Sequence, residues 1–324
     1  MHASTHSDPL TSTMPAPAQI APCPSCKHPD THNLGPIAPG FFFAGQRLDP
    51  PLPGGNLYCC PACLLCFRFP RPPQDVLEVL YKQAPSTNWI YEQHHRPDWN
   101  ITHDWLSRRH PAGGRILDLG CYDGAFLDTL PPSWQRFGVE MSEAALARAR
   151  QRDITILGRD IMTLPPATLQ MHAATAFDVI EHVADPLGFL HRMAGIVCPG
   201  GTIIISTGNT RALPWRLMGS RYWYCTIPEH ISFINDAWCR SAAQQLNLQL
   251  LALETYSHDS NASIGKRIYE LGTNLLYRFA PSVFALLRRM GFGDKNTRQH
   301  EALQYFPPTW STAHDHIVAI FARP

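Results

Sequence analysis

The stretch Ile-Leu-Asp-Leu-Gly-Cys-Tyr-Asp-Gly-Ala-Phe-Leu, residues 116–127, decides the fold. Its first residues have the apolar character of a short buried strand, and Gly120 and Gly124 allow a tight turn into a helix. Glu140 follows twenty residues after Gly120, at the end of a second apolar strand, 136–140. A strand, a glycine turn, a helix and a second strand in this order indicate the first unit of a parallel sheet with crossover helices.

The same alternation continues to the C-terminus, where helical segments such as 142–152 and 185–197 separate apolar strands. The strands are expected at residues 115–120, 136–140, 153–157, 176–181, 200–207, 248–256 and 316–322. This pattern predicts an α/β fold, a doubly wound, mostly parallel seven-stranded sheet of Rossmann-like type, with helices on both faces.

The amino-acid composition limits the binding partners and the cellular location that can be expected. The chain has 324 residues, enough for about two domains, and a formal net charge of +1. It therefore lacks the broad basic surface that nucleic acids require, and no nucleic-acid partner is expected. Residues 1–20 are rich in Ser, Thr, Pro and Ala, which indicates a disordered tail, and they lack the charged and apolar regions of an export signal. A cytoplasmic location is expected.

Six of the ten cysteines fall between residues 23 and 66. Cys23 and Cys26 form one C-x-x-C pair, and Cys60 and Cys63 form a second, so together they can complete a tetrahedral, four-thiolate Zn²⁺ site with a structural role. Cys63 with Cys66 is the alternative register. This spacing predicts a small zinc-ribbon-like module at 21–70, followed by a helical connector at 71–112 and the α/β domain at 113–324.

The glycine turn also bears on the ligand. In a sheet of this kind, ligands bind beyond the carboxyl ends of the strands, where an acid such as Glu140 can accept hydrogen bonds from ribose hydroxyls. A pyrophosphate-binding loop needs bare glycine amides, but Tyr122 occupies the second glycine position and Asp118 and Asp123 flank the turn. Carboxylates repel pyrophosphate and suit an ammonium or sulfonium group, which favours S-adenosylmethionine over NAD.

These segments resemble the class I S-adenosylmethionine-dependent methyltransferases over roughly residues 97–256. The first motif of that family matches 116–127, its fourth-strand motif matches Phe-Asp-Val-Ile-Glu-His-Val-Ala-Asp-Pro at 177–186, and its fifth-strand entry matches 198–207. The stretch 60–81 is similar to the zinc-ribbon head of a subset whose methyl acceptors include sugars and other small metabolites. The resemblance implies cofactor contacts from Asp118, Gly120, Cys121, Tyr122, Asp123, Gly124, Glu140, Met141, Asp160, Ile161, Asp178 and Glu181.

Methyl transfer to oxygen or carbon also requires a base, and histidine suits neutral pH. His230 follows the fifth strand among aromatic residues and is the first candidate; His182, after the fourth strand, is the second. Glu229 and Glu181 are weaker candidates because an unperturbed carboxylate is a poor base. Glu-His-Val-Ala at 181–184 replaces the Asp/Asn-Pro-Pro-Tyr pattern typical of methylation at planar nitrogen. An oxygen or carbon of a small-molecule acceptor, such as a sugar or secondary metabolite, is therefore expected.

Two other functions compete with this one. In the first, an RNA methyltransferase uses the cysteine module to bind nucleic acid, but residues 21–70 hold only Lys27, Arg47 and Arg68 as cations. In the second, the protein docks a partner and binds the cofactor without turnover. An apolar, basic insertion at 257–313 could form a lid, a subunit contact or a peripheral membrane contact, or could pack on its own domain.

Overall fold

The computed structural model describes residues 21–43, 46–83, 96–165, 169–292 and 306–324. The expected disordered tail, 1–20, lies outside them. Seven strands form the main sheet in the order β12-β13-β10-β9-β6-β7-β8. Their bounds are β6 Gly114–Leu119, β7 Trp134–Val139, β8 Thr155–Gly158, β9 Met171–Phe177, β10 Val197–Gly208, β12 Gln249–Tyr256 and β13 His316–Ala322.

The predicted doubly wound sheet is confirmed. Strands β6 to β10 pair in parallel, and only β13 runs antiparallel to its neighbours β10 and β12 within this sheet. Strand order reverses between β6 and β9, the two strands followed by the glycine turn and by Asp178. The carboxyl ends of the central strands therefore open the crevice where such sheets bind ligands.

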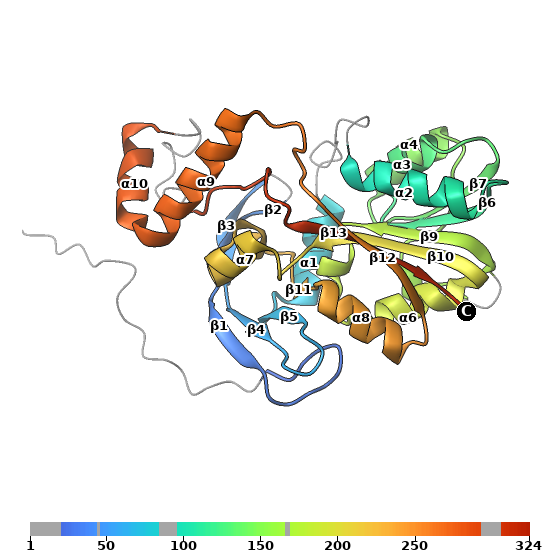
Figure 1. Ribbon diagram of the computed structural model, residues 1–324, viewed down its shortest axis with the longest axis horizontal. Coiled ribbons are helices and arrows are strands. Elements are labelled where there is room, and N and C mark those ends of the chain that lie inside the picture. Colours follow the sequence, from blue (N-terminus) through green and yellow to red (C-terminus); the bar gives the residue numbers. More distant parts are fainter. Residues whose placement is uncertain (1–20, 44–45, 84–95, 166–168, 293–305) are drawn as a thin grey trace, which may run out of the picture.

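Helices cover both faces of the sheet (Figure 1). One face packs against α6 and α8, whose Phe189 and Trp238 are buried, and the other against α2, α3 and α4, through Leu106 and Phe126 among others. Their bounds are α2 Pro97–Arg109, α3 Ala125–Asp128, α4 Glu143–Gln151, α6 Pro186–Ile196 and α8 Asp236–Gln245.

The fourth strand of the domain lies earlier than its sequence pattern predicts. It was expected at 176–181, but β9 ends at Phe177, and residues 180–182 form a 3₁₀ turn. Asp178 has a φ of 52°, in the left-handed region, so the extended backbone cannot continue through it. The strand itself contains small alanines, which carry a weak strand signal and fit here because both faces of the sheet are covered.

The cysteine-rich segment folds as short antiparallel strands, which the sequence did not resolve individually. Their bounds are β1 His32–Pro36, β2 Gly40–Phe43, β3 Gln46–Leu52, β4 Asn56–Cys59 and β5 Cys66–Phe69. A short strand from much later in the chain, β11 (Ser232–Phe233), pairs with β5 and completes the sheet β1-β4-β5-β11. The helix α1 (Gln74–Gln83) buries Leu77 against Phe43 and Leu52. The cysteine-rich segment is thus joined to the main domain by backbone pairing.

Within the expected insertion lie two helices, α9 (Ile264–Phe279) and α10 (Pro281–Met290), which form a hairpin away from the sheet (Figure 1). Tyr277 and Phe284 are buried, but many apolar side chains are not, so packing on the domain accounts for only part of the apolar surface. A further helix, α7 (Leu213–Met218), precedes the loop that carries His230. In the described part of the chain, no helix is long and apolar enough to cross a membrane.

Candidate active site

The turn after β6 has the backbone of a glycine loop even where it carries a side chain. Gly120 has a φ of 73°, and a Cβ there would lie 2.6 Å from Cγ2 of Val179. Tyr122 has a φ of 48°, in the region that glycine enters most easily, and the Arg148 guanidinium carbon lies 5.3 Å from its ring centroid. The tyrosine therefore keeps the tight turn expected of a glycine.

Glu140 joins this turn to the next strand. Its Oε2 accepts a hydrogen bond from the Tyr122 amide at 2.9 Å, and its Oε1 accepts one from the Ser142 amide at 2.7 Å. Burial raises the pKa of Glu140, and the backbone donors oppose that shift. Since a carboxylate oxygen can accept more than one hydrogen bond, the oriented carboxylate keeps capacity for ribose hydroxyls.

The two aspartates near the turn lie in different surroundings. Asp118 is 3% exposed, accepts a hydrogen bond from Thr175 Oγ1 at 2.7 Å, and has its pKa raised to about 7 by burial. Asp123 is also buried, but its Oδ2 lies 3.3 Å from Nη2 of Arg152 and 3.9 Å from Nε of Arg148. Arginines within the chain therefore compensate Asp123, whereas no ion pair with Asp118 occurs among the described residues.

The remaining cofactor candidates lie at the ends of neighbouring strands. Met141 follows β7 and is exposed, and the Asp160 side chain caps the short turn that contains the buried Ile161. Cys121 is buried beneath the turn, where its sulfur would contact any Cβ at position 138. The structure thus brings these candidates to one edge of the sheet.

Asp178 is held by an arginine that sequence reasoning did not identify. Nη2 of Arg96 lies 2.7 Å from Oδ2 of Asp178 and 2.6 Å from Oδ2 of Asp98. Burial raises the pKa of Asp178, but Arg96, His258 and His316 outweigh burial and lower it to about 2. Oδ1 of Asp178 is buried and has no hydrogen-bond partner among the described residues, so the carboxylate has an acceptor available for a ligand.

Glu181 lies deeper, behind the same edge. It is 1% exposed and accepts hydrogen bonds from Tyr224 Oη at 2.6 Å and from Thr207 Oγ1 at 2.9 Å. Burial, reinforced by the negative charge of Asp178, raises the pKa of Glu181 to about 7. Its contacts connect the turn after β9 to the end of β10 and to the aromatic segment before His230.

The two histidines singled out from the sequence lie together, with ring centroids 4.8 Å apart. His230 is buried, and its Nδ1 lies 3.1 Å from the Tyr224 carbonyl oxygen, which can only accept, so Nδ1 donates and Nε2 keeps its lone pair. Burial lowers the pKa of His230 well below its usual value. Nδ1 of His182 lies 2.9 Å from Tyr81 Oη and 3.1 Å from the Glu229 carbonyl oxygen.

The aromatic residues around His230 form a buried cluster rather than an open wall. The Tyr224 ring centroid lies 4.2 Å from that of His230, and Tyr222 and Phe233 pack behind it with Trp215. Glu229 is buried, which raises its pKa, and its Oε2 has no hydrogen-bond partner among the described residues. The cluster fixes the loop that carries His230.

Arg68 is a second residue whose role could not be foreseen. It is completely buried and donates hydrogen bonds to four carbonyl oxygens, those of Gly54, Cys225, Ile227 and His230, at 2.9, 2.6, 3.0 and 3.2 Å. These contacts link the cysteine-rich segment to the loop that carries His230. Three of the four join residues about 160 positions apart, which no local sequence pattern reveals.

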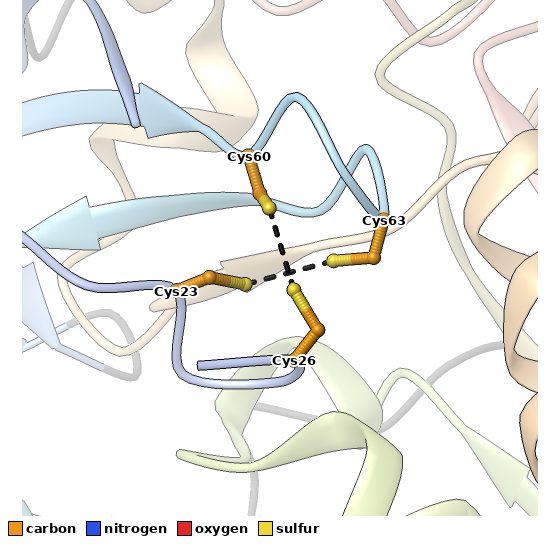
Figure 2. A group of neighbouring side chains, drawn as sticks. All are labelled: Cys23, Cys26, Cys60 and Cys63. Carbon is orange, nitrogen blue, oxygen red and sulfur yellow. Dashed lines mark hydrogen bonds between the residues drawn. The ribbon is translucent and has the colours of Figure 1, made fainter. Parts of the chain in front are cut away.

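The four cysteines of the two C-x-x-C pairs converge on one point (Figure 2). The sulfurs of Cys23 and Cys63 are 3.6 Å apart, those of Cys26 and Cys60 are 3.5 Å apart, and all four lie within 4.8 Å of one another. Zinc–sulfur bonds of about 2.3 Å in a tetrahedron place sulfurs about 3.8 Å apart, so this cluster fits a zinc ion. Cys66, the alternative ligand, instead pairs across the strands with Cys59.

Comparison with known proteins gives the family. A family model described as a methyltransferase domain matches residues 92–253. A ubiquinone biosynthesis O-methyltransferase of Alkalilimnicola ehrlichii is 30% identical over 148 residues, 40% of this chain and 60% of that protein. One of Coxiella burnetii (strain Dugway 5J108-111) is 27% identical over 152 residues, 43% of this chain and 65% of that protein. The alignments thus span about three fifths of these relatives' length.

Among solved structures, the magnesium protoporphyrin IX methyltransferase of Synechocystis PCC 6803 with bound SAH is 11% identical. The match covers 70% of this chain and 82% of that one, with a TM-score of 0.44. The family model covers half of the present chain, including the glycine turn, Glu140 and the segment from Asp178 to His182. The chain therefore belongs to the class I S-adenosylmethionine-dependent methyltransferases.

Proposed function

We propose that this protein transfers a methyl group from S-adenosylmethionine to an oxygen or carbon of a small-molecule acceptor, such as a sugar or secondary metabolite. The observation that carries the proposal is the tight turn after β6, locked by the Glu140 carboxylate at the reversal point of the sheet. Family membership supports the same reaction. We also propose that the chain is divided into a zinc-ribbon-like module at 21–70, a helical connector at 71–112 and a catalytic domain at 113–324.

The residues at this edge suit the cofactor. Glu140 would accept hydrogen bonds from the ribose hydroxyls, while Gly120 lets the ligand approach the backbone. Asp118 and Asp178 would face the amino-acid end, because Asp118 has no ion pair within the described residues and Asp178 keeps a free buried oxygen. Met141, Asp160 and Ile161 would border the adenine. Glu181 would act indirectly, by accepting the hydrogen bonds that position Tyr224 and Thr207.

When bound, S-adenosylmethionine supplies an electrophilic methyl group on a sulfonium. The chain has to align the acceptor and exclude water, which are the main tasks in an in-line displacement. We propose that His230 and His182 line the acceptor side and that Nε2 of His230 accepts a hydrogen bond from the acceptor. Arg68 and the aromatic cluster would hold this loop in position.

Incubation of cell extracts with the purified protein and methyl-labelled S-adenosylmethionine tests this function, with mass spectrometry of every labelled product. The expected result is a small molecule labelled on oxygen or carbon. Label confined to RNA or to protein would contradict the proposed acceptor class. Absence of label, together with absence of S-adenosylhomocysteine binding, would contradict the reaction.

We propose further that Cys23, Cys26, Cys60 and Cys63 hold one Zn²⁺ with a structural role. Four thiolates complete a tetrahedral shell and leave no position for a substrate. The two C-x-x-C pairs lie beside the sheet in which β5 pairs with β11. Because β11 ends the loop that follows β10, metal binding would also stabilise that loop.

We propose an anionic membrane surface as the partner of the α9–α10 hairpin. Residues 264–292 contain five cations and a single carboxylate, Glu270, which is buried against Thr312. Exposed apolar side chains lie along the same hairpin: Ile264, Ile268, Tyr269, Leu271, Phe279, Val283, Leu286, Met290 and Phe292. An amphipathic, basic face of this kind suits an interface with anionic lipid.

Co-sedimentation with vesicles tests the membrane contact. Vesicles of phosphatidylcholine with phosphatidylglycerol should bind the protein, and vesicles of phosphatidylcholine alone should bind it less. Ile268→Asp should abolish the difference. A stable dimer that Ile268→Asp dissociates, without vesicle binding, would instead assign this face to a second subunit.

A further inference from the structure

Three titratable side chains lie in a line at the edge of the sheet formed by the carboxyl ends of the central strands. The function proposed above assigns no role to them. Asp315 directly precedes β13, His316 begins it, and His258 follows β12. Nδ1 of His316 lies 2.9 Å from Oδ1 of Asp315, and Nε2 of His316 lies 3.0 Å from Nε2 of His258. Asp315 and His316 are completely buried, whereas His258 is half-buried, so the line leads from the interior toward solvent.

The hydrogen bonds decide where protons can lie. The carboxylate of Asp315 only accepts, so Nδ1 of His316 donates to it. When His316 is neutral, its Nε2 must accept from Nε2–H of His258, and Nδ1 of His258 then keeps a lone pair. The half-buried member of the line is therefore the one that can accept a proton, and a carboxylate orients the line from its other end.

The charges around the two rings favour a proton on His316 over one on His258, although Asp178 and Asp315 raise the pKa of His258 as well. Asp178 after β9, Glu181 in the following turn and Asp315 before β13 are the acids that act on His316, while Arg96 at the start of α2 acts against protonation of His258. Burial and His316 lower the pKa of His258 to about 4; burial also acts to lower that of His316, but Asp315 outweighs burial and raises it. A proton taken up by the pair therefore resides on His316, next to Asp315.

The line lies next to the site already described. The Tyr224 ring centroid is 5.2 Å from that of His316 and 4.2 Å from that of His230, so Tyr224 separates the two groups of histidines. Tyr256 packs against both His258 and His316. His230, by contrast, has a neutral carbonyl as the partner of its Nδ1 and no carboxylate bonded to its ring among the described hydrogen bonds. A Glu181 oxygen lies within 4.8 Å of a ring nitrogen of His230, but none of the described hydrogen bonds orients that carboxylate toward the ring as Asp315 is oriented toward His316.

We propose that His258 is the general base of methyl transfer, with His316 and Asp315 as the positioning residues that receive and stabilise the proton. This rests on the proposed function. The acceptor oxygen or carbon forms a bond to the methyl carbon, and the sulfonium–methyl electron pair leaves with sulfur. The O–H or C–H electron pair stays with the acceptor atom. The proton moves to Nδ1 of His258 while Nε2–H of His258 passes to His316. After the transfer, the proton on Nε2 of His316 returns to Nε2 of His258, and the half-buried His258 gives up the proton on its Nδ1 to water. His230 then positions the acceptor.

A titration of the full-length protein tests the line without any acceptor. In ¹⁵N spectra of the imidazoles, His258 and His316 should take up one proton between them, with an apparent pKa above the usual value for histidine. Asp315→Asn should lower that apparent pKa, because the stabilising carboxylate is lost. Independent titration of the two rings, or no change in Asp315→Asn, would overturn the proposal.

Activity gives the second test, with labelled product from extract as the readout. His258→Ala should lower kcat by about 10²–10⁴ without weakening S-adenosylhomocysteine binding, and added imidazole should restore part of the rate. His191→Ala, at an exposed position on α6, is the matched control and should match the wild type.

The pH profile separates a base from a structural residue. Since the base must be neutral, the wild-type rate should rise with pH through the apparent pKa of the pair, and Asp315→Asn should move that limb to lower pH and reduce the plateau. If wild-type protein binds S-adenosylhomocysteine and labels the acceptor while His258→Ala is equally active, the line is not the base. If wild-type protein does neither, the proposed function itself fails.

Discussion

At the scale of single residues, the site depends on carboxylates buried at the edge of the sheet. Burial raises the pKa of Asp118 and that of Glu181 to about 7, well above the usual values for carboxylic acids. Their charged forms are therefore disfavoured in the ligand-free protein. A cationic ligand group nearby would favour those charged forms, which couples cofactor binding to proton release.

The raised pKa of Asp118 also predicts that the stability of the ligand-free protein depends on pH. Because the folded-state pKa of Asp118 is raised, the native protein binds more protons than the unfolded chain, and its stability falls as pH rises toward and through about 7. Asp118→Asn should make the free energy of unfolding vary less between pH 6 and 8, as measured with urea. An Asp118→Asn variant with an unchanged slope would show that Asp118 is not protonated in the fold.

The roles of some residues could be predicted from the sequence, and those of others could not. Glu140 was predictable because a fixed spacing from Gly120 and the strand–turn–helix order place it at the sheet edge. Arg68, Arg96 and His258 were not, because their partners are distant in sequence and their roles arise only when separate segments pack together. Their roles in the structure are set by tertiary contacts and not by local patterns.

At the scale of elements, the parallel strands were predictable where their apolar runs were long, as in β10. The position of β9 was not, since its alanines carry little strand signal and the stronger Val-Ile pair lies in the following turn. The strand β11 has only two residues and exists through its pairing with β5. Short elements of this kind depend on partners rather than on propensity.

Arg68 connects two of these elements, and its removal should be costly. Arg68→Met should destabilise the protein by about 3–5 kcal/mol, because four buried or half-buried carbonyl groups lose their donor. Urea unfolding measures the change, and Arg47→Met, at an exposed position in β3, serves as control. A loss below about 1 kcal/mol would mean that water replaces the guanidinium and that the link is weak.

The cysteine cluster gives a second prediction at this scale. Purified protein should contain one zinc per chain, and Cys60→Ser should lose it, whereas Cys66→Ser should retain it because Cys66 faces Cys59. Elemental analysis of the two variants measures this. Zinc loss only in Cys66→Ser would assign the other register.

At the scale of the whole molecule, the zinc-type cluster, the loop that carries His230 and the sheet edge form one connected unit. The strand β11 and Arg68 join the cysteine-rich segment to the loop, and Tyr224 joins the loop to Glu181 and His316. The family match covers the parallel strands β6 to β10 and the start of β12. The proposed acceptor side combines the matched segments that carry His182 and His230 with β13 and the cysteine-rich segment, which lie outside residues 92–253.

The central claim is that the edge at β6 and β7 binds S-adenosylmethionine, and a calorimetric titration with S-adenosylhomocysteine tests it most directly. The wild-type protein should bind S-adenosylhomocysteine and not NAD. Glu140→Ala should weaken binding by about 2 kcal/mol or more, since a charged hydrogen-bond acceptor is lost. Glu143→Ala, three residues further on and exposed, should bind as the wild type does. Equal affinity in Glu140→Ala, or binding of NAD in place of S-adenosylhomocysteine, would contradict the account.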